Sequence, residues 1–218
     1  MVKRLLAGRS AVMVAAVLLA AAFPLLVSCD GDDGGTTPTP EVFAYPHADG
    51  SEWVYSYEGE NIVKYVISGT YGHPSAGSTQ KLISYVNVTD AWEKYDTQYL
   101  KVTSTDVRLY LDKTSAGYYM LLKFPLEVGN QWNAGKGYTA NVSSKPTMSV
   151  PAGSFSCYKI DYTSSSWNMT FWWPSSVGGM GAKNYGLWSM GTTPITIDLR
   201  SYNSVSYTHL TLPTTPYV

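Results

Sequence analysis

Short runs in which β-branched or aromatic residues alternate with other residues dominate the chain between about residues 42 and 204. β-branched and aromatic side chains recur at every second position of these runs, and Gly, Pro, Asn, Asp and Ser separate one run from the next. Trp53, Tyr55 and Tyr57 form one such series. No segment repeats its apolar residues with the helical period of about 3.6. The pattern predicts strands over residues 52–58, 61–71, 80–89, 95–103, 107–112, 118–123, 138–142, 148–150, 155–163, 167–173, 182–185 and 195–202.

The connections between these runs are short. Parallel neighbours need crossover connections of about a dozen residues or more, so we expect the strands to pair sequentially and antiparallel. A segment of this length buries enough surface to form one core. The prediction is a single all-β, mainly antiparallel domain over residues 42–204, built either as an open barrel or as a sandwich-like fold.

Charged residues are scarce. They make up 14% of the chain, against roughly 25% in typical soluble domains, and the formal net charge is -1. A disordered chain combines low hydrophobicity with high net charge, and a coiled coil needs abundant Glu, Lys, Leu and Ala. A nucleic-acid-binding protein needs a basic surface for the phosphate backbone. The composition excludes these three classes, so no nucleic acid is expected as a partner.

The N-terminus has the features of an export signal. Three basic residues, at positions 3, 4 and 9, precede an apolar stretch over residues 10–26. Residues 26–29, Leu-Val-Ser-Cys, resemble the lipobox of bacterial lipoproteins, in which the cysteine becomes the acylated N-terminus. The resemblance implies a signal peptide over residues 1–28, lipidation of Cys29 and a place in the bacterial cell envelope, with the membrane as a partner. A plain membrane anchor is the alternative, since the apolar run is close to the shortest membrane span of about 17 residues.

Two further segments flank the predicted domain. Residues 29–41 are rich in Asp, Gly, Thr and Pro, and they predict a flexible tether that follows the acylated Cys29. Without residues 1–28 the chain has 12 basic and 16 acidic residues, a formal charge of -4. Residues 205–218 resemble an in-frame translation of a common sequencing adapter, which implies an artefactual tail. A natural β-rich tail is the alternative.

Three segments resemble a pattern that recurs in secreted and lipid-anchored bacterial proteins of unknown activity. Residues 124–132 read FPLEVGNQW and residues 150–155 read VPAGSF, which match "PL-x-VG-x-x-W" and "VPAG-x-F". Residues 172–181, WWPSSVGGMG, match a third "W-x-AP-GVG-x-V" element in part. The similarity spans most of residues 50–204. It implies a relative of the open β-barrel of lipoprotein carriers, and it implies no particular activity.

Chemically reactive residues are few and form no catalytic or metal-binding pattern. Cys29 and Cys157 are the two cysteines, so once Cys29 is acylated no disulfide or thiolate zinc site remains within one chain. We expect Cys157 to be buried in a strand. His47 and His73 have no metal-ligand spacing, and we expect both in exposed loops. The sequence therefore predicts no catalytic residue, no metal and no cofactor.

Aromatic side chains are the feature that suggests binding. Trp172 and Trp173 are adjacent, so within a strand one faces the core and the other faces away. Together with Tyr158 and Tyr162 they are candidate residues for an apolar or glycan ligand; alternatively, both faces are covered and the rings only pack. The sequence favours a non-catalytic binding or structural module. A carbohydrate-binding surface module and an envelope glycan hydrolase, with two carboxylates brought together by the fold, are the alternatives.

Overall fold

Antiparallel strands make up all the regular secondary structure of the part described. The structure is a computed structural model that describes residues 45–165, 168–175, 177–186 and 195–205. The expected all-β, mainly antiparallel class is confirmed. The strands are β1 (Glu52–Tyr57), β2 (Glu60–His73), β3 (Gly77–Val88), β4 (Ala91–Val102), β5 (Asp106–Tyr110), β6 (Tyr119–Lys123), β7 (Gln131–Gly135), β8 (Tyr138–Ser144), β9 (Thr147–Val150), β10 (Gly153–Thr163), β11 (Asn168–Pro174), β12 (Lys183–Gly186) and β13 (Ile195–Asn203).

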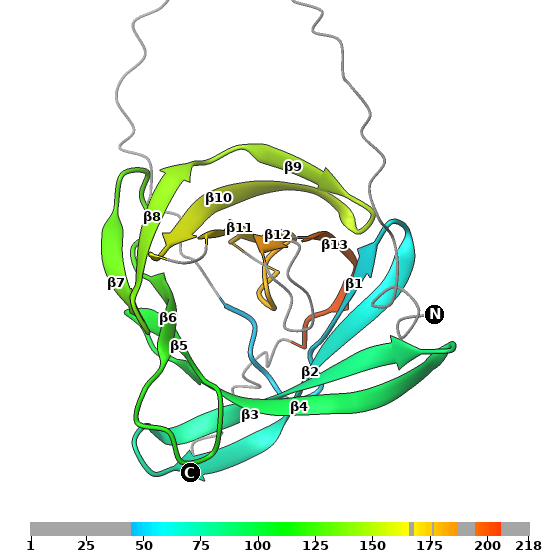
Figure 1. The fold of residues 1–218 in the computed structure, drawn as a ribbon, viewed down its shortest axis with the longest axis horizontal. Coiled ribbons are helices and arrows are strands. Elements are labelled where there is room, and N and C mark those ends of the chain that lie inside the picture. Colours follow the sequence, from blue (N-terminus) through cyan, green and yellow to red (C-terminus); the bar gives the residue numbers. More distant parts are fainter. Residues whose placement is uncertain (1–44, 166–167, 176, 187–194, 206–218) are drawn as a thin grey trace, which may run out of the picture.

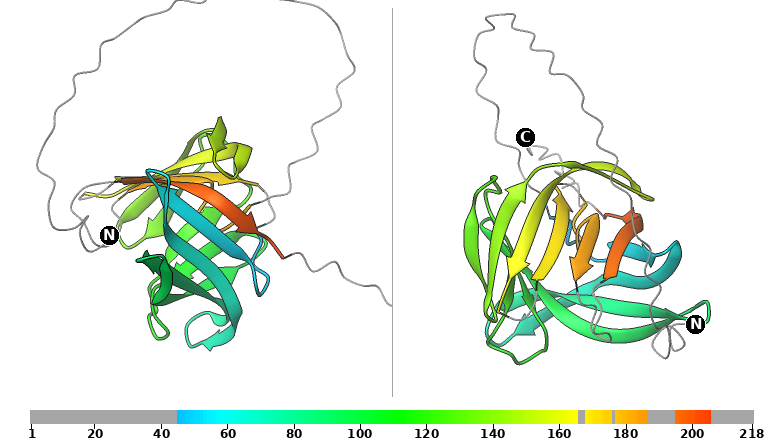
Figure 2. Two further views of the ribbon diagram at one scale, coloured as in Figure 1. Left: turned by 90° about the vertical axis from the view of Figure 1, so that its right-hand side faces the viewer. Right: turned by 45° about the horizontal axis from the view of Figure 1, so that its top comes forward.

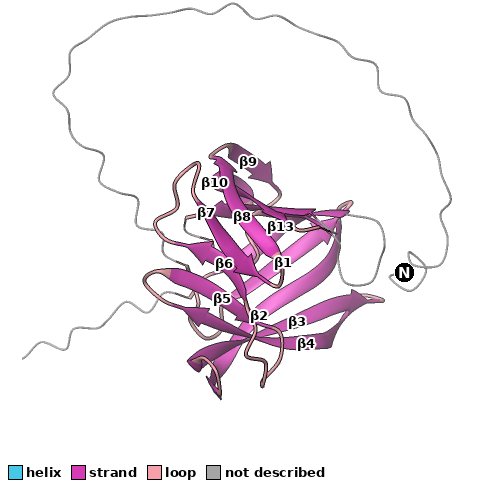
Figure 3. Ribbon diagram, turned by 60° about the vertical axis from the view of Figure 1, so that its left-hand side comes forward, coloured by secondary structure: helices cyan, strands magenta, loops and turns pink. Residues whose placement is uncertain are grey.

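The strands form a nearly closed barrel (Figure 1). Their order around it is β6-β5-β4-β3-β2-β1-β13-β12-β11-β10-β8-β7, and β9 pairs with the first part of β10. The pairing of β1 with β13 joins the two ends of the domain. Among the described strands, the ring of ladder hydrogen bonds is open at one place, between the consecutive strands β6 and β7, which we call the seam. Figure 3 shows these two strands side by side.

Alternation along each strand decides which side chains fill the interior. On β2, Val63, Tyr65 and Ile67 are buried in the core, while Lys64 between them points to the opposite face. Trp53 and Tyr55 on β1 follow the same rule and are fully buried. Burial of side chains of this size stabilises the fold by about 1.5–3 kcal/mol each. The alternation expected from the sequence therefore identifies the inner face correctly.

The interior of the barrel also contains chain that is not in strands. Residues 177–182, which follow β11, pack onto the aromatic residues of β1 and onto the first described residue, Tyr45. The Tyr45 hydroxyl donates to the carbonyl of Gly179 at 2.6 Å, and the Trp53 indole N–H donates to the carbonyl of Val177 at 2.7 Å. These bonds satisfy polar groups that the apolar interior would otherwise leave unpaired. The interior is thus filled by a glycine-rich segment and large aromatic rings.

Each expected strand has a counterpart, and the structure adds β7, which the sequence prediction missed. Its five residues, QWNAG, include Asn and Gly, which are poor strand formers. Trp132 and Ala134 nevertheless alternate into the core. Residue 167 of the expected strand 167–173 lies outside the described residues, as do Cys29 and most of the flanking segments, residues 1–44 and 206–218.

The expectation of an exposed loop for His73 is wrong. Its side chain is 2% exposed and lies at the end of β2, in a small aromatic cluster outside the main core. The segment after β5 covers this cluster, and the His73 Nε2 lies 3.1 Å from the carbonyl of Asp112 in that segment. His47 is half-buried. The rings that contact His73 are those of Tyr71, Tyr99 and Tyr110.

Candidate binding surface

Polar side chains lie in two cross-strand rows on the outer face of β7, β8, β10 and β11. Inward-facing residues such as Ile160 and Ala140 alternate with them along the strands. Strand spacing places neighbours within a row about 4.8 Å apart. We call these eight residues the polar grid. In register order, the first row is Gln131, Asn141, Asp161 and Thr170, and the second row is Asn133, Thr139, Thr163 and Asn168.

The polar grid lines an open hollow of about 680 Å³. Seven of its eight members contribute to the hollow, together with the partly buried Met169, and Asn133 lies just beyond it. The four strands stand next to one another in the barrel wall, as the right-hand view of Figure 2 shows. Each strand in this surface is paired with at least one neighbour. It presents amide, hydroxyl and carboxylate groups at regular spacing.

Asp161 is the one carboxylate among the residues that line this hollow. The Thr170 hydroxyl donates to its Oδ1 at 2.7 Å, and the Lys159 ammonium lies 3.5 Å from its Oδ2. Partial burial alone would raise the pKa of Asp161, but hydrogen bonds from Thr170 and Ser143 and the charge of Lys159 outweigh it and lower the pKa. Asp161 is therefore an ionised hydrogen-bond acceptor at neutral pH.

Trp172 lies on the same outer face as the polar grid, two residues along β11 from Thr170. In the register of the sheet it stands between Lys159 on β10 and Lys183 on β12. Lys183 is in turn 3.2 Å from Asp198 on β13. The Trp172 side chain is half-buried. An indole flanked by two ion-paired lysines therefore borders the polar grid.

The other three candidate residues from the sequence lie on the inner face. Trp173 is fully buried and stacks on Phe171, with ring centroids 5.8 Å apart. Tyr162 meets Phe171 edge-to-face, and its hydroxyl donates to the carbonyl of Leu121 on β6. Tyr158 is buried as well, and the Lys145 ammonium lies 4.5 Å from the centre of its ring. The structure thus separates Trp172 from Trp173, Tyr158 and Tyr162, and these three rings belong to the core.

The polar grid was not predicted from the sequence. Each of the four strands carries two of its members at positions i and i+2, for example Asn168 and Thr170 on β11. That repeat was a usable signal. Single Asn and Thr residues on the outer face of a strand are common, however, and only the register of the sheet shows that four pairs from separate strands form one surface.

In residues 45–165 and the three shorter described segments, no three His, Cys, Asp or Glu side chains come together as a metal ion would require. Within those same segments, no helix has the length and apolar character to cross a membrane.

No protein-family model matches the chain, and no curated protein matches it in sequence. Among solved structures, the chain is similar to a protein assigned as a lipoprotein of Parabacteroides distasonis ATCC 8503. The two share 13% identity with a TM-score of 0.44, over 74% of this chain and 99% of that chain. A second similar structure is an exported protein with a YmcC-like fold from Bacteroides fragilis NCTC 9343, with 13% identity and a TM-score of 0.36 over the same shares of both chains.

Proposed function

We propose that the protein is a lipid-anchored, non-catalytic module of the bacterial cell envelope that binds a glycan on the polar grid. The lipobox-like residues 26–29 and the polar residues 29–41 support anchoring through Cys29 and a tether that holds the domain away from the lipid. The membrane is then a partner through acyl chains, since a chain with a formal charge of -4 has little attraction for anionic headgroups.

The observation that carries the proposal is the composition and spacing of the polar grid. Amide groups and threonine hydroxyls both donate and accept hydrogen bonds, and the Asp161 carboxylate accepts them. A sugar presents hydroxyl groups that do the same, so the two surfaces complement each other. The volume of the hollow, about 680 Å³, falls in the range of ligand sites. Trp172 at the border offers an indole on which the apolar face of a sugar ring can stack.

The alternatives are less well supported by the described residues. Carriage of an apolar ligand needs an internal cavity, whereas Tyr45, Trp53 and residues 177–182 fill the interior. A glycoside hydrolase needs two carboxylates about 5–10 Å apart across a cleft. Asp161 is the one carboxylate that lines the hollow of the polar grid, which favours binding over hydrolysis.

A glycan array probed with the full chain carrying Cys29→Ser tests the binding proposal. We expect one or more glycans to be retained and the double variant Asn141→Ala/Asp161→Asn to bind them about tenfold more weakly, because it loses one neutral and one charge-assisted acceptor. Asp90→Asn, in the exposed turn between β3 and β4, is the matched control and should bind as the parent does. If no glycan is retained, or if the double variant binds equally well, the proposal is wrong.

Anchoring has its own test. Cells fed a fatty-acid analogue should label the protein, and membrane fractionation should recover it with the lipid. Cys29→Ser should abolish both results, because the acylated thiol is lost. Labelling that persists in Cys29→Ser would contradict the anchor without affecting the glycan proposal.

A further inference from the structure

A second hollow lies at the seam and shares β7 with the polar grid. Its volume is about 540 Å³, and it opens between β6 and the far side of β7. Asn133, a member of the polar grid, lines it, while Gln131, two residues away on the same strand, lines the first hollow. The two hollows therefore border β7 on its two sides.

The seam hollow differs from the polar grid in its charge. Lys123 and Lys136 line it, and none of its lining residues is a carboxylate. Lys64, Arg108, Lys159 and Lys183 form ion pairs with described carboxylates, whereas neither of these two lysines pairs with a described residue. An ammonium group without a counter-charge at a concave surface attracts anions. The positive charge is local, since the chain without residues 1–28 carries a formal -4.

The two ammonium groups stand at opposite ends of the seam. Lys123 is the last residue of β6, which spans five residues or about 16 Å. Lys136 lies in the turn after β7, and its Nζ is 2.7 Å from the position that a Cβ on Gly117, before β6, would occupy. Glycine at position 117 therefore leaves room for this ammonium group. A ligand that meets both lysines must extend along the seam and carry more than one anionic group.

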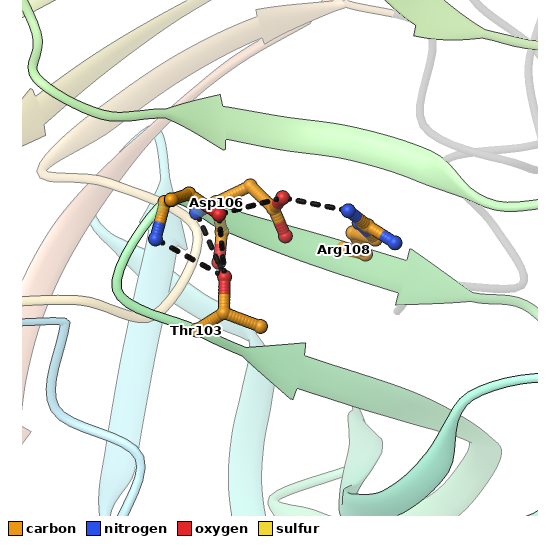
Figure 4. Close-up of polar contacts among 4 residues, drawn as sticks. Thr103, Asp106 and Arg108 are labelled. Atoms are coloured by element: carbon orange, nitrogen blue, oxygen red, sulfur yellow. Dashed lines mark hydrogen bonds and ion pairs between the residues drawn. The ribbon is translucent and has the colours of Figure 1, made fainter.

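The nearest carboxylate on the neighbouring strand is already neutralised. Asp106 on β5 is the cross-strand neighbour of Lys123, but it is buried, and its Oδ2 accepts from the Arg108 guanidinium at 2.7 Å (Figure 4). Backbone and hydroxyl contacts with Thr103 hold Asp106 at the start of the strand. Arg108 in turn lies 5.0 Å from the ring centre of Tyr118, which lines the seam hollow. Among the described residues, Lys123 and Lys136 therefore have no ion-pair partner.

We infer that the seam hollow is an anion subsite of the surface formed with the polar grid, and that the glycan bound there is an acidic one. The inference rests on the proposed glycan binding and names its ligand class. Hydroxyl groups of the sugar chain contact the polar grid on β8, β10 and β11. Carboxylate or other anionic groups further along the same chain contact Lys123 and Lys136.

Calorimetric titration with two matched probes tests the inference. Oligogalacturonate and its methyl ester have the same sugar backbone and differ in charge. The full chain carrying Cys29→Ser should bind oligogalacturonate about three- to tenfold more tightly than the ester, because two exposed ion pairs contribute modestly each. High salt should reduce this preference, since it screens exposed charges.

Substitutions test whether the two seam lysines cause the preference for the acid. Lys123→Gln/Lys136→Gln should lose the preference for the acid and keep its affinity for the ester. Lys94→Gln, an exposed lysine on β4, is the matched control and should keep the preference. Equal affinity for acid and ester, failure of both probes to bind, or a preference that survives the double substitution would each overturn the inference. The glycan array decides the proposed function independently, since retention of a neutral glycan there would leave that proposal standing.

Discussion

Trp132 on β7 donates its indole N–H to the main-chain carbonyl of Met120 on β6 at 3.0 Å, across the only break in the ring of strands that the described residues form. Tyr162 on β10 adds a second bond of this kind, from its hydroxyl to the carbonyl of Leu121. Leu121 lies at a register shift between β5 and β6, which frees its carbonyl from the ladder. Aromatic donors from the core thus hold the seam where main-chain hydrogen bonds do not.

Replacing Trp132 by Phe should lower the free energy of unfolding by about 1–2 kcal/mol, because the Met120 carbonyl loses its donor while most of the ring remains. Urea denaturation followed by circular dichroism measures this. Trp172→Phe makes the same chemical change on the outer face and should cost less than about 0.5 kcal/mol. Equal stability of Trp132→Phe and the parent would show that the bond contributes nothing.

Gly179→Ala should be strongly destabilising. Gly179 has a φ of +61°, and a Cβ there would lie 2.6 Å from the Trp53 ring. Gly137→Ala is the matched control, because its φ is +83° and a Cβ there meets nothing within 4 Å. Gly137→Ala should lower the free energy of unfolding by about 1–2 kcal/mol because of backbone strain. Gly179→Ala should lower it by about 1–3 kcal/mol more because of overpacking. Similar melting temperatures for the two variants would contradict the packing of residues 177–182 inside the barrel.

The Cys157 thiol should be unreactive in the folded protein. It is fully buried, as the sequence analysis expected, and burial raises its pKa to about 12, so very little thiolate exists at pH 8. In the Cys29→Ser chain, where it is the remaining cysteine, a thiol reagent should label it slowly before addition of urea and rapidly afterwards. Rapid labelling of the folded chain would show that β10 is more open than the structure has it.

Asp161 should make stability depend on pH in the acid range. Because hydrogen bonds and Lys159 lower its folded pKa, its ionised form stabilises the fold at pH values above the unfolded pKa of about 3.9. That contribution is lost as pH falls through the folded pKa. The gap in unfolding free energy between the parent and Asp161→Asn should therefore be larger at neutral pH than near pH 3. Thr170→Val, which removes a donor to the carboxylate, should show part of the same effect, and a gap independent of pH would refute the assignment.

Local sequence patterns determined much of the architecture. Two-residue alternation identified the strands and their inner faces, and short connections predicted antiparallel neighbours. Strand β7 was missed because Asn and Gly interrupt its pattern, although Trp132 and Ala134 alternate correctly. His73 was misplaced because a Gly-His-Pro turn is polar in sequence, whereas the segment after β5, including Asp112, covers it in three dimensions.

In the candidate site, too, the local sequence pattern determined some features and the tertiary structure determined others. Adjacency alone determined that Trp172 and Trp173 face opposite sides of a strand, since side chains alternate there with a period of two. Only the tertiary structure decided that Trp173 faces the core and that Trp172 borders the polar grid. The alternation of neighbouring side chains between the two faces of a strand is a local property of the backbone. The register of the sheet, in contrast, depends on pairings between distant segments, such as β1 with β13. That closure and the packing inside the barrel set where the seam lies and which polar side chains meet across four strands.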